Sequence, residues 1–121
     1  MKKTKGTIAA GHQATADAAA HILREGGNAF DAAISALLAS FVAEPGMSSA
    51  GGGAFLTAFA ADQGAAFTYD SFVQTPLSKK PAAQTEFLPI EIDFGTARET
   101  FYVGMGSVAV PGNIAGIWKL H

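Results

Sequence analysis

The chain reads Gly26-Gly27-Asn28-Ala29-Phe30-Asp31-Ala32-Ala33 at the point that decides its fold. The glycine pair predicts the end of a helix over 12–25, because glycine accepts the left-handed backbone conformation that helix ends use. Asn28 and Asp31 stand three residues apart, the spacing at which two side chains cap a following helix. That second helix is apolar on most faces, so we expect it to be covered on both sides, and Glu44-Pro45 ends it. The stretch therefore predicts two packed helices joined by a tight link.

Strand patterns follow the helices. Apolar and small residues alternate over 54–61, the turn 62–64 supplies a glycine, and 65–70 returns as the partner strand of a hairpin. Trp118 lies one helical turn from Ile114 and is expected in the core. Further strands are expected at 7–10, at 87–94 and within 100–110, and a last helix is expected to open at Pro111-Gly112-Asn113. Because the helices and strands do not alternate regularly, the sequence predicts an α+β fold.

Composition excludes several classes of function. The 121 residues are enough for one domain, 49% are apolar and only 15% are charged, below the usual quarter of a soluble domain. The net charge of −2 gives no basic face for nucleic acid. There is no cysteine, and the three histidines lack a metal-ligand spacing, so we expect no metal and no other cofactor.

The two ends of the chain carry further expectations. Residues 1–6 are basic, but the apolar stretch after them is too short for a signal peptide, and no run of about 18 apolar residues could cross a membrane. We therefore expect no membrane contact and a cytoplasmic location. The last helix reaches His121 without a stop signal, so the natural protein is expected to continue.

Two candidate sites compete with a structural role for the same residues. The backbone amides of Gly51-Gly52-Gly53 could cradle an anion. The run precedes a strand, however, and no lysine follows it. We therefore favour the interpretation that two backbone segments approach closely there. A Ser-His-Asp triad could combine Ser48 or Ser49 with His12 and Asp70, but neither serine lies in a GxSxG motif. Asp70 is expected just after a strand. We expect its carboxylate to cap the next loop, and the alternative is that it orients a neighbouring group.

Three segments together resemble the gamma-glutamyltransferase (gamma-glutamyltranspeptidase) family. Residues 11–33 are similar to its two helices joined by a GGNAxDAA link. Residues 44–55 resemble its EPxxSGxGGGxF entry into a hairpin, and residues 107–116 resemble its SVAVPGxVAG segment. The three stand in the family's order and span most of the chain.

The resemblance implies a fold, a chemistry and partners. The fold is the N-terminal-nucleophile hydrolase type, a four-layer αββα sandwich, of which residues 1–121 would form an incomplete part: a helical hairpin followed by antiparallel strands. The enzymes of this family are cut autocatalytically into two subunits, and the new amino-terminal threonine of the small subunit attacks a gamma-glutamyl amide. This chain would be the N-terminal segment of the large subunit, with no catalytic residue of its own. Its partners would be a small-molecule amide substrate, the remainder of the large subunit and the small subunit.

One position departs from the family pattern. In the family the hairpin is followed by Asp-Phe-Arg-Glu, whose arginine pairs with the substrate's α-carboxylate. With Asp70 and Pro76 aligned, Phe72 stands in place of that arginine, and phenylalanine cannot pair with a carboxylate. Arg98, expected in a later loop, could supply the charge from another direction. The alternatives are a relative that acts on a different amide, as an acylase does, or a non-catalytic binding or structural module.

Overall fold

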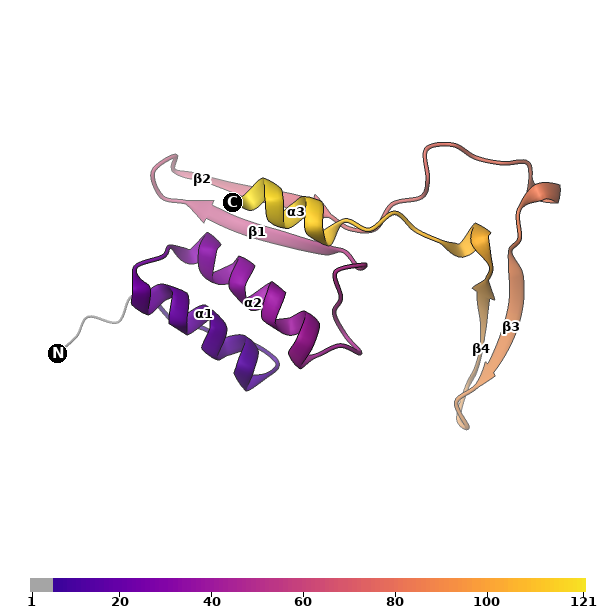
Figure 1. Ribbon diagram of the computed structural model, residues 1–121, viewed down its shortest axis with the longest axis horizontal. Coiled ribbons are helices and arrows are strands. Elements are labelled where there is room, and N and C mark those ends of the chain that lie inside the picture. The colour runs from indigo at the N-terminus through magenta and orange to yellow at the C-terminus, as the bar shows by residue number, and fades with distance from the viewer. Residues whose placement is uncertain (1–5) are drawn as a thin grey trace. The chain divides into compact units, whose positions relative to one another are not determined.

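The computed structural model describes residues 6–121, so most of the basic start considered above as a targeting signal lies outside it. The described chain forms two compact units (Figure 1). The first contains the chain up to Val73 together with Pro111–His121, and the second is Gln74–Val110.

The first unit begins with the two predicted helices. Helix α1 spans Gln13–Glu25 and α2 spans Ala29–Ala43. Gly26 ends α1 with a φ of 105°, the left-handed conformation that the sequence predicts there. The capping box is also confirmed. Asn28 Oδ1 accepts hydrogen bonds from the backbone N–H groups of Phe30 and Asp31 at 2.7 and 3.0 Å, and Asp31 Oδ2 accepts from the Asn28 N–H at 3.0 Å.

Substituting the cap should measurably destabilise the helical pair. We expect Asn28→Ala to lower the free energy of unfolding by about 1 kcal/mol, because two N–H groups at the start of α2 lose their side-chain acceptor. Asn28→Gly is the matched control. We expect it to lower the free energy of unfolding by only about a few tenths of a kcal/mol, since glycine is also favoured at this position. Urea denaturation followed by circular dichroism measures both. Equal losses for the two variants would contradict this role for the Asn28 side chain.

Helices α1 and α2 lie side by side (Figure 1). The buried Ala19 and Ala32 are small enough to let helices approach closely. A polar contact ties the start of α1 to the end of α2, where Thr15 Oγ1 donates to Glu44 Oε2 at 2.8 Å. Thr15 is itself buried, so the bond satisfies a hydroxyl that water does not reach freely.

The predicted hairpin is present in the first unit. Strand β1 (Ala54–Ala60) pairs with antiparallel β2 (Ala65–Ser71), and Gly64 closes the turn at a φ of 63°. The connection has four residues, 61–64, rather than the predicted three, because β1 ends one residue earlier. Helix α3 (Asn113–Leu120) follows Gly112, as the sequence predicts.

The two faces of this hairpin differ in their surroundings. Leu56 shares an apolar cavity with residues of α2 and α3, so these two helices cover its face. Helix α2 is thus packed between α1 and the hairpin, as its apolar sequence predicts, although Leu38 and Val42 stay exposed. On the opposite face Phe55 and Phe59 remain 63% and 64% exposed. An apolar face of this kind needs a covering partner.

Two sequence predictions for the first unit are wrong. Residues 7–10 form no strand, because they pair with neither of the two described hairpins. Trp118 is 82% exposed and Ile114 54%, so neither lies in the core of the described residues. The inner side of α3 is instead the one with Gly116 and Ile117, since Gly116 lies against Ser71 of β2.

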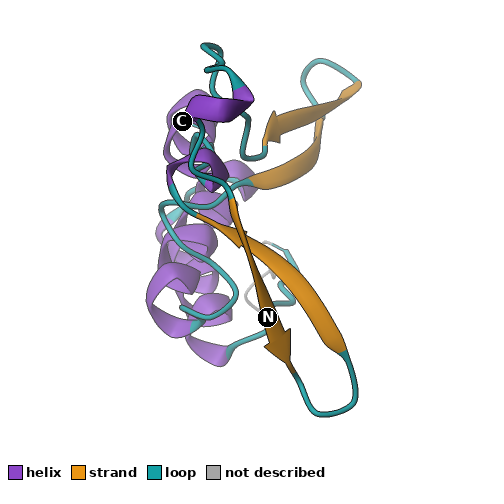
Figure 2. Ribbon diagram, turned by 90° about the vertical axis from the view of Figure 1, so that its right-hand side faces the viewer, coloured by secondary structure: helices purple, strands orange, loops and turns teal. Residues whose placement is uncertain are grey.

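The second unit contains another hairpin, whose strands are among those drawn in orange in Figure 2. Strand β3 (Leu88–Asp93) pairs with antiparallel β4 (Arg98–Val103), which confirms the two predicted strands. Strand β3 lies within the predicted range, whereas β4 begins two residues before position 100. Gly104, at a φ of 106°, ends β4 and leads into the short 3-10 helix η2 (Met105–Ser107). A second 3-10 helix, η1 (Ala82–Gln84), precedes β3.

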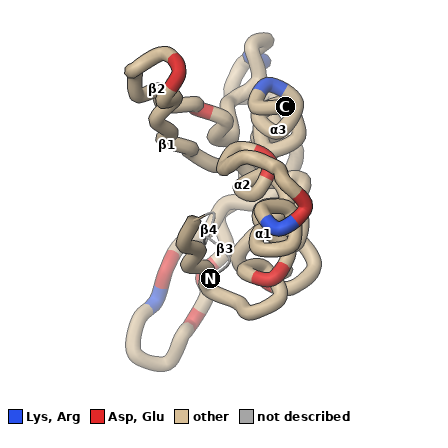
Figure 3. The backbone as a smooth tube through the Cα atoms, turned by 90° about the vertical axis from the view of Figure 1, so that its left-hand side faces the viewer, with Lys and Arg blue, Asp and Glu red and all other residues tan. Residues whose placement is uncertain are grey.

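Charge is sparse in the structure, as the composition requires. Figure 3 shows long uncharged stretches of backbone, and α2 and β1 together contain only one charged residue, Asp31. Within residues 6–121, no helix combines the length and apolar character needed to cross a membrane.

Candidate functional site

The motifs of the sequence converge where β1 begins, β2 ends and α3 begins. We call this region the hairpin base and define it as residues 52–55, 70–73 and 112–116. Its centre is the backbone carbonyl of Gly52, which accepts hydrogen bonds from the N–H groups of Gly112 and Asn113 at 3.0 and 3.1 Å. The glycine-rich entry to β1 is thereby joined directly to the first turn of α3.

Glycine is required at the hairpin base because backbone segments touch there. A Cβ on Gly53 would lie 2.7 Å from the Phe72 backbone, and one on Gly112 would lie 2.6 Å from the Ser71 carbonyl carbon. Real Cβ atoms essentially never approach so closely. The close-approach interpretation of the glycine run is therefore confirmed for Gly52 and Gly53, whereas Gly51 has room for a side chain. Within the run, the Gly52 N–H that an anion would need is already bonded to the Ser49 carbonyl at 3.1 Å.

Asp70 caps the chain as it leaves β2, which is the role expected first for this residue. Its Oδ1 accepts a hydrogen bond from the backbone N–H of Phe72 at 3.0 Å. The carboxylate thereby fixes the local turn that presents Phe72. Ser71 strengthens the same corner, since its Oγ donates to the Ala54 carbonyl at 2.8 Å.

Phe72 is part of an aromatic pair that the sequence analysis missed. Its ring stacks on that of Phe55, with centroids 5.3 Å apart and an interplanar angle of 12°. The strand register explains the meeting, because Phe55 lies directly opposite Asp70, two residues before Phe72. Both rings stay partly exposed, Phe72 at 47%. The alternating pattern of β1 and β2 could have singled out Phe55, because pairing the two strands residue by residue from the turn places Phe55 opposite Asp70.

Arg98 belongs to the second unit, where it is the first residue of β4 and not part of a loop as expected. Its guanidinium forms an exposed ion pair with Asp93, with Nη2 and Nε each 3.1 Å from Oδ2. The ion pair thus joins the two strands at the turn end of this hairpin. Asp70 and Phe72 are the two sequence-selected residues that the first unit brings together.

The alternative triad is not assembled in the structure. His12 Nδ1 accepts from the Ala14 N–H at 3.1 Å and caps α1, and Ser48 bonds to Ser40 at 2.9 Å. Asp70 is engaged by Phe72, as described above. Over residues 6–121, no three His, Cys, Asp or Glu side chains gather where they could hold a metal ion.

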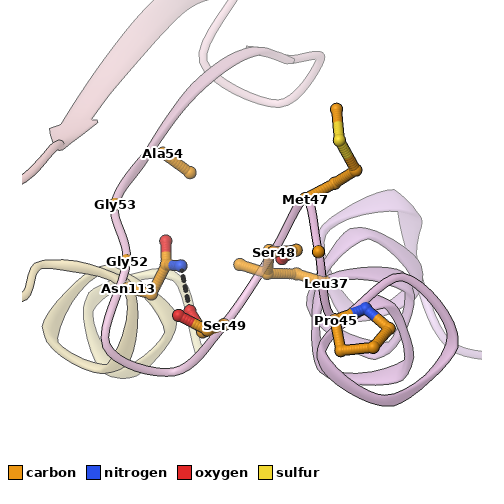
Figure 4. Close-up of a pocket in the computed structure, with 10 residues that line it drawn as sticks. Leu37, Pro45, Met47, Ser48, Ser49, Gly52, Gly53, Ala54 and Asn113 are labelled. Atoms are coloured by element: carbon orange, nitrogen blue, oxygen red, sulfur yellow. Dashed lines mark hydrogen bonds between the residues drawn. The ribbon is translucent and has the colours of Figure 1, made fainter. Parts of the chain in front are cut away.

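A cavity of ≈ 430 Å³ adjoins the hairpin base (Figure 4). It lies between the end of α2, the 45–53 loop and Asn113, whose Nδ2 donates to the Ser49 carbonyl at 2.7 Å. Asn113 is 3% exposed, and its Oδ1 has no hydrogen-bond partner. Sequence analysis gave no reason to single out this residue.

Comparisons with known proteins agree with the motifs. The family model described as Gamma-glutamyltranspeptidase matches residues 15–121. A glutathione hydrolase proenzyme of Pseudomonas aeruginosa is 34% identical over 117 residues, covering 96% of this chain and 20% of its own length. The Acylase ACY 1 proenzyme of a Pseudomonas species is 38% identical over 117 residues, covering 93% of this chain and 20% of its own length.

A solved structure gives the same result for the fold. The gamma-glutamyltranspeptidase of Pseudomonas nitroreducens superposes with a TM-score of 0.72 at 30% identity, covering 96% of this chain and 32% of that one. The predicted α+β fold, a partial one of the N-terminal-nucleophile hydrolase type, is confirmed. The chain spans about a fifth of the length of these curated relatives.

Proposed function

This chain belongs to the gamma-glutamyltranspeptidase family, and from that premise we propose that it forms the N-terminal segment of the large subunit of a gamma-glutamyltransferase-like enzyme. The enzyme would hydrolyse an amide-linked gamma-glutamyl group or transfer it to an acceptor. The observation that carries the proposal is the family match over residues 15–121, which includes both hairpins, α2, α3 and all of α1 except its first two residues.

In this proposal the chain provides support and one wall of the substrate site, and the nucleophile lies outside residues 1–121. An amino-terminal threonine of the small subunit would attack the amide carbonyl, with its own α-amine taking the proton. The leaving amine would depart, and water or an amino acid would then take the acyl group from the threonine. The glycine contacts of the hairpin base would keep the wall of the site rigid during these steps.

The proposed partners are the remainder of the large subunit and the small subunit, both from one precursor. The outward face of the first hairpin supports this, because Phe55 and Phe59 are more than half exposed there. Two-stranded hairpins are marginally stable in water unless something packs on them. Further strands of the same enzyme are the covering that the proposed fold provides.

Asp70, Phe72 and Arg98 are our candidates for residues on the substrate side. Phe72 would face the part of the substrate that the family arginine holds, and Asp70 would fix its position through the 3.0 Å bond to the Phe72 N–H. Arg98 would contribute only if it left Asp93, to which it is bound in this structure.

We propose acylase-like hydrolysis as a second candidate function, and one structural observation supports it. The Phe55–Phe72 stack presents two aromatic rings at the hairpin base, where the Asp70 carboxylate accepts from the Phe72 N–H. A second carboxylate there would meet an apolar surface and a like charge, both of which disfavour it. An apolar acyl group would bury area against the rings instead.

Expression of the full-length protein tests the leading proposal. We expect the precursor to cut itself into two chains, the smaller beginning with threonine, and to release the chromophore from a gamma-glutamyl anilide or from an apolar acyl anilide. Intact-mass spectrometry and absorbance measure the two results. Substitution of the new terminal threonine by alanine should abolish both. A precursor that stays single-chain and turns over neither amide would instead support a structural or binding role.

A further inference from the structure

The hairpin of the second unit contains one proline, whose place in the ladder shows which backbone groups face outward. Next to the turn, the Phe94 N–H donates to the Ala97 carbonyl at 2.9 Å, so these two residues form a hydrogen-bonded pair. Hydrogen-bonded and non-hydrogen-bonded pairs alternate along an antiparallel ladder. By this alternation Pro89 and Tyr102 form a non-hydrogen-bonded pair, in which each residue turns its backbone groups away from the other strand. The nitrogen of Pro89 therefore lies at the outer edge of β3.

The two outer edges of this hairpin differ for that reason. On β3, proline has no N–H to donate, so a ladder with a further strand would be interrupted at Pro89. On β4, the same alternation turns the N–H and C=O groups of Arg98, Thr100 and Tyr102 outward, and this strand contains no proline. Every residue of β4 is exposed, and within residues 6–121 the strand pairs with β3 alone. Natural proteins cover, bulge or break such an edge, and only β3 is broken here.

The two faces of the hairpin indicate the side chains that an added strand would need. The register places four large apolar side chains on one face, each between 40% and 53% exposed: Leu88, Ile90, Phe101 and Val103. The opposite face is polar towards the turn, where Thr100 Oγ1 donates to Glu91 Oε1 at 2.5 Å. A strand that continued this sheet would therefore alternate apolar and polar side chains.

We propose that the outer edge of β4 is extended by a strand of the same protein from outside residues 1–121, apolar on the face of Phe101 and polar on the face of Thr100. An extended backbone is the partner that complements N–H and C=O groups repeated at every second residue of an edge. The choice of the same protein rests on the proposed function, in which this chain is part of a larger enzyme, and a curated relative is about five times as long. A segment of the same molecule also has a higher effective concentration than a second copy.

Hydrogen–deuterium exchange on the unmodified full-length protein, resolved to single residues, tests this proposal. After correction for intrinsic rates, we expect the N–H groups of Thr100 and Tyr102 to exchange at least about tenfold more slowly than that of Glu91, because only the former gain a hydrogen-bond partner. Glu91 is the internal control, since it lies opposite Thr100 and its N–H faces outward on β3. Equal rates at the three positions would overturn the proposal. Protection that falls on dilution would also overturn it, because it would assign the edge to a second copy.

A matched pair of proline variants tests the same edge from the other side. Thr100→Pro removes an outward N–H from β4, and Glu91→Pro removes one from β3. Both variants lose the same side-chain hydrogen bond between these residues, and neither loses a backbone bond between the two strands. We expect Thr100→Pro to speed exchange by about fivefold or more in one segment outside residues 1–121, and Glu91→Pro to leave that segment unchanged. Equal effects of the two variants on that segment, or no effect of either, would overturn the proposal.

Self-cleavage and amide hydrolysis by the same samples report on the proposed function separately. Slow exchange at Thr100 and Tyr102 in a protein without turnover would support the added strand while contradicting the enzymatic activity. Turnover by a protein in which both N–H groups exchange as fast as that of Glu91 would overturn the added strand and leave the activity established.

Discussion

Gly112→Ala is expected to destabilise the folded protein by about 3 kcal/mol or more. The added Cβ would meet the Ser71 carbonyl oxygen, with the Ser71 carbonyl carbon at 2.6 Å and the Phe72 oxygen at 2.8 Å. All three atoms belong to the backbone of the chain leaving β2, so no side chain can rotate away. Relief would require α3 to separate from β2, which would break the bonds from Gly112 and Asn113 to Gly52.

Gly46→Ala is the matched control for this prediction. A Cβ at Gly46 has no heavy atom within 4 Å, so we expect a change within about 0.5 kcal/mol. Urea denaturation curves of the two variants and the unmodified protein measure the difference. Gly53→Ala should resemble Gly112→Ala, because it also meets backbone, that of Phe72 and Val73. Similar stability for Gly112→Ala and Gly46→Ala would show that the hairpin base can open without cost.

Phe72→Arg in the full-length enzyme is expected to shift the specificity by about 10- to 100-fold towards gamma-glutamyl amides and away from apolar acyl amides. A guanidinium at this position would bind an α-carboxylate through two charge-assisted hydrogen bonds, and a bond to a charged group contributes about 1.5–3 kcal/mol. The same change removes the ring that stacks on Phe55 at 5.3 Å. The ratio of kcat/KM for the two amides measures the shift, because it compares the stabilisation of two transition states by one enzyme.

Phe59→Arg provides the control for added charge. Phe59 lies on the same outward face of β1 as Phe55 and is 64% exposed, but it is opposite Ala66 and distant from Asp70 in the register. We expect no change in the ratio for this variant. If Phe72→Arg also left the ratio unchanged, Phe72 would not contact the acyl group, and the acylase-like candidate would lose its supporting observation.

The sequence alone determined the elements whose causes are local. The glycine pair ends α1 through bonds that span four and five positions, and the Asn28–Asp31 pair starts α2 through bonds that span three. Asp70 caps its own loop across two residues. The alternation of β1 and β2 with a glycine at the turn likewise specifies a hairpin without reference to the rest of the chain.

The tertiary structure decided everything that depends on which distant residues meet. Phe55 reaches Phe72, and Asn113 reaches Ser49 across 64 positions of sequence. Helical spacing showed that Ile114 and Trp118 share a face, but only the packing of Gly116 on Ser71 turned that face outward. A local pattern fixes backbone conformation, since its hydrogen bonds close within a few residues. The side of an element that is buried is set by the partner that covers it, and that partner is a property of the whole fold.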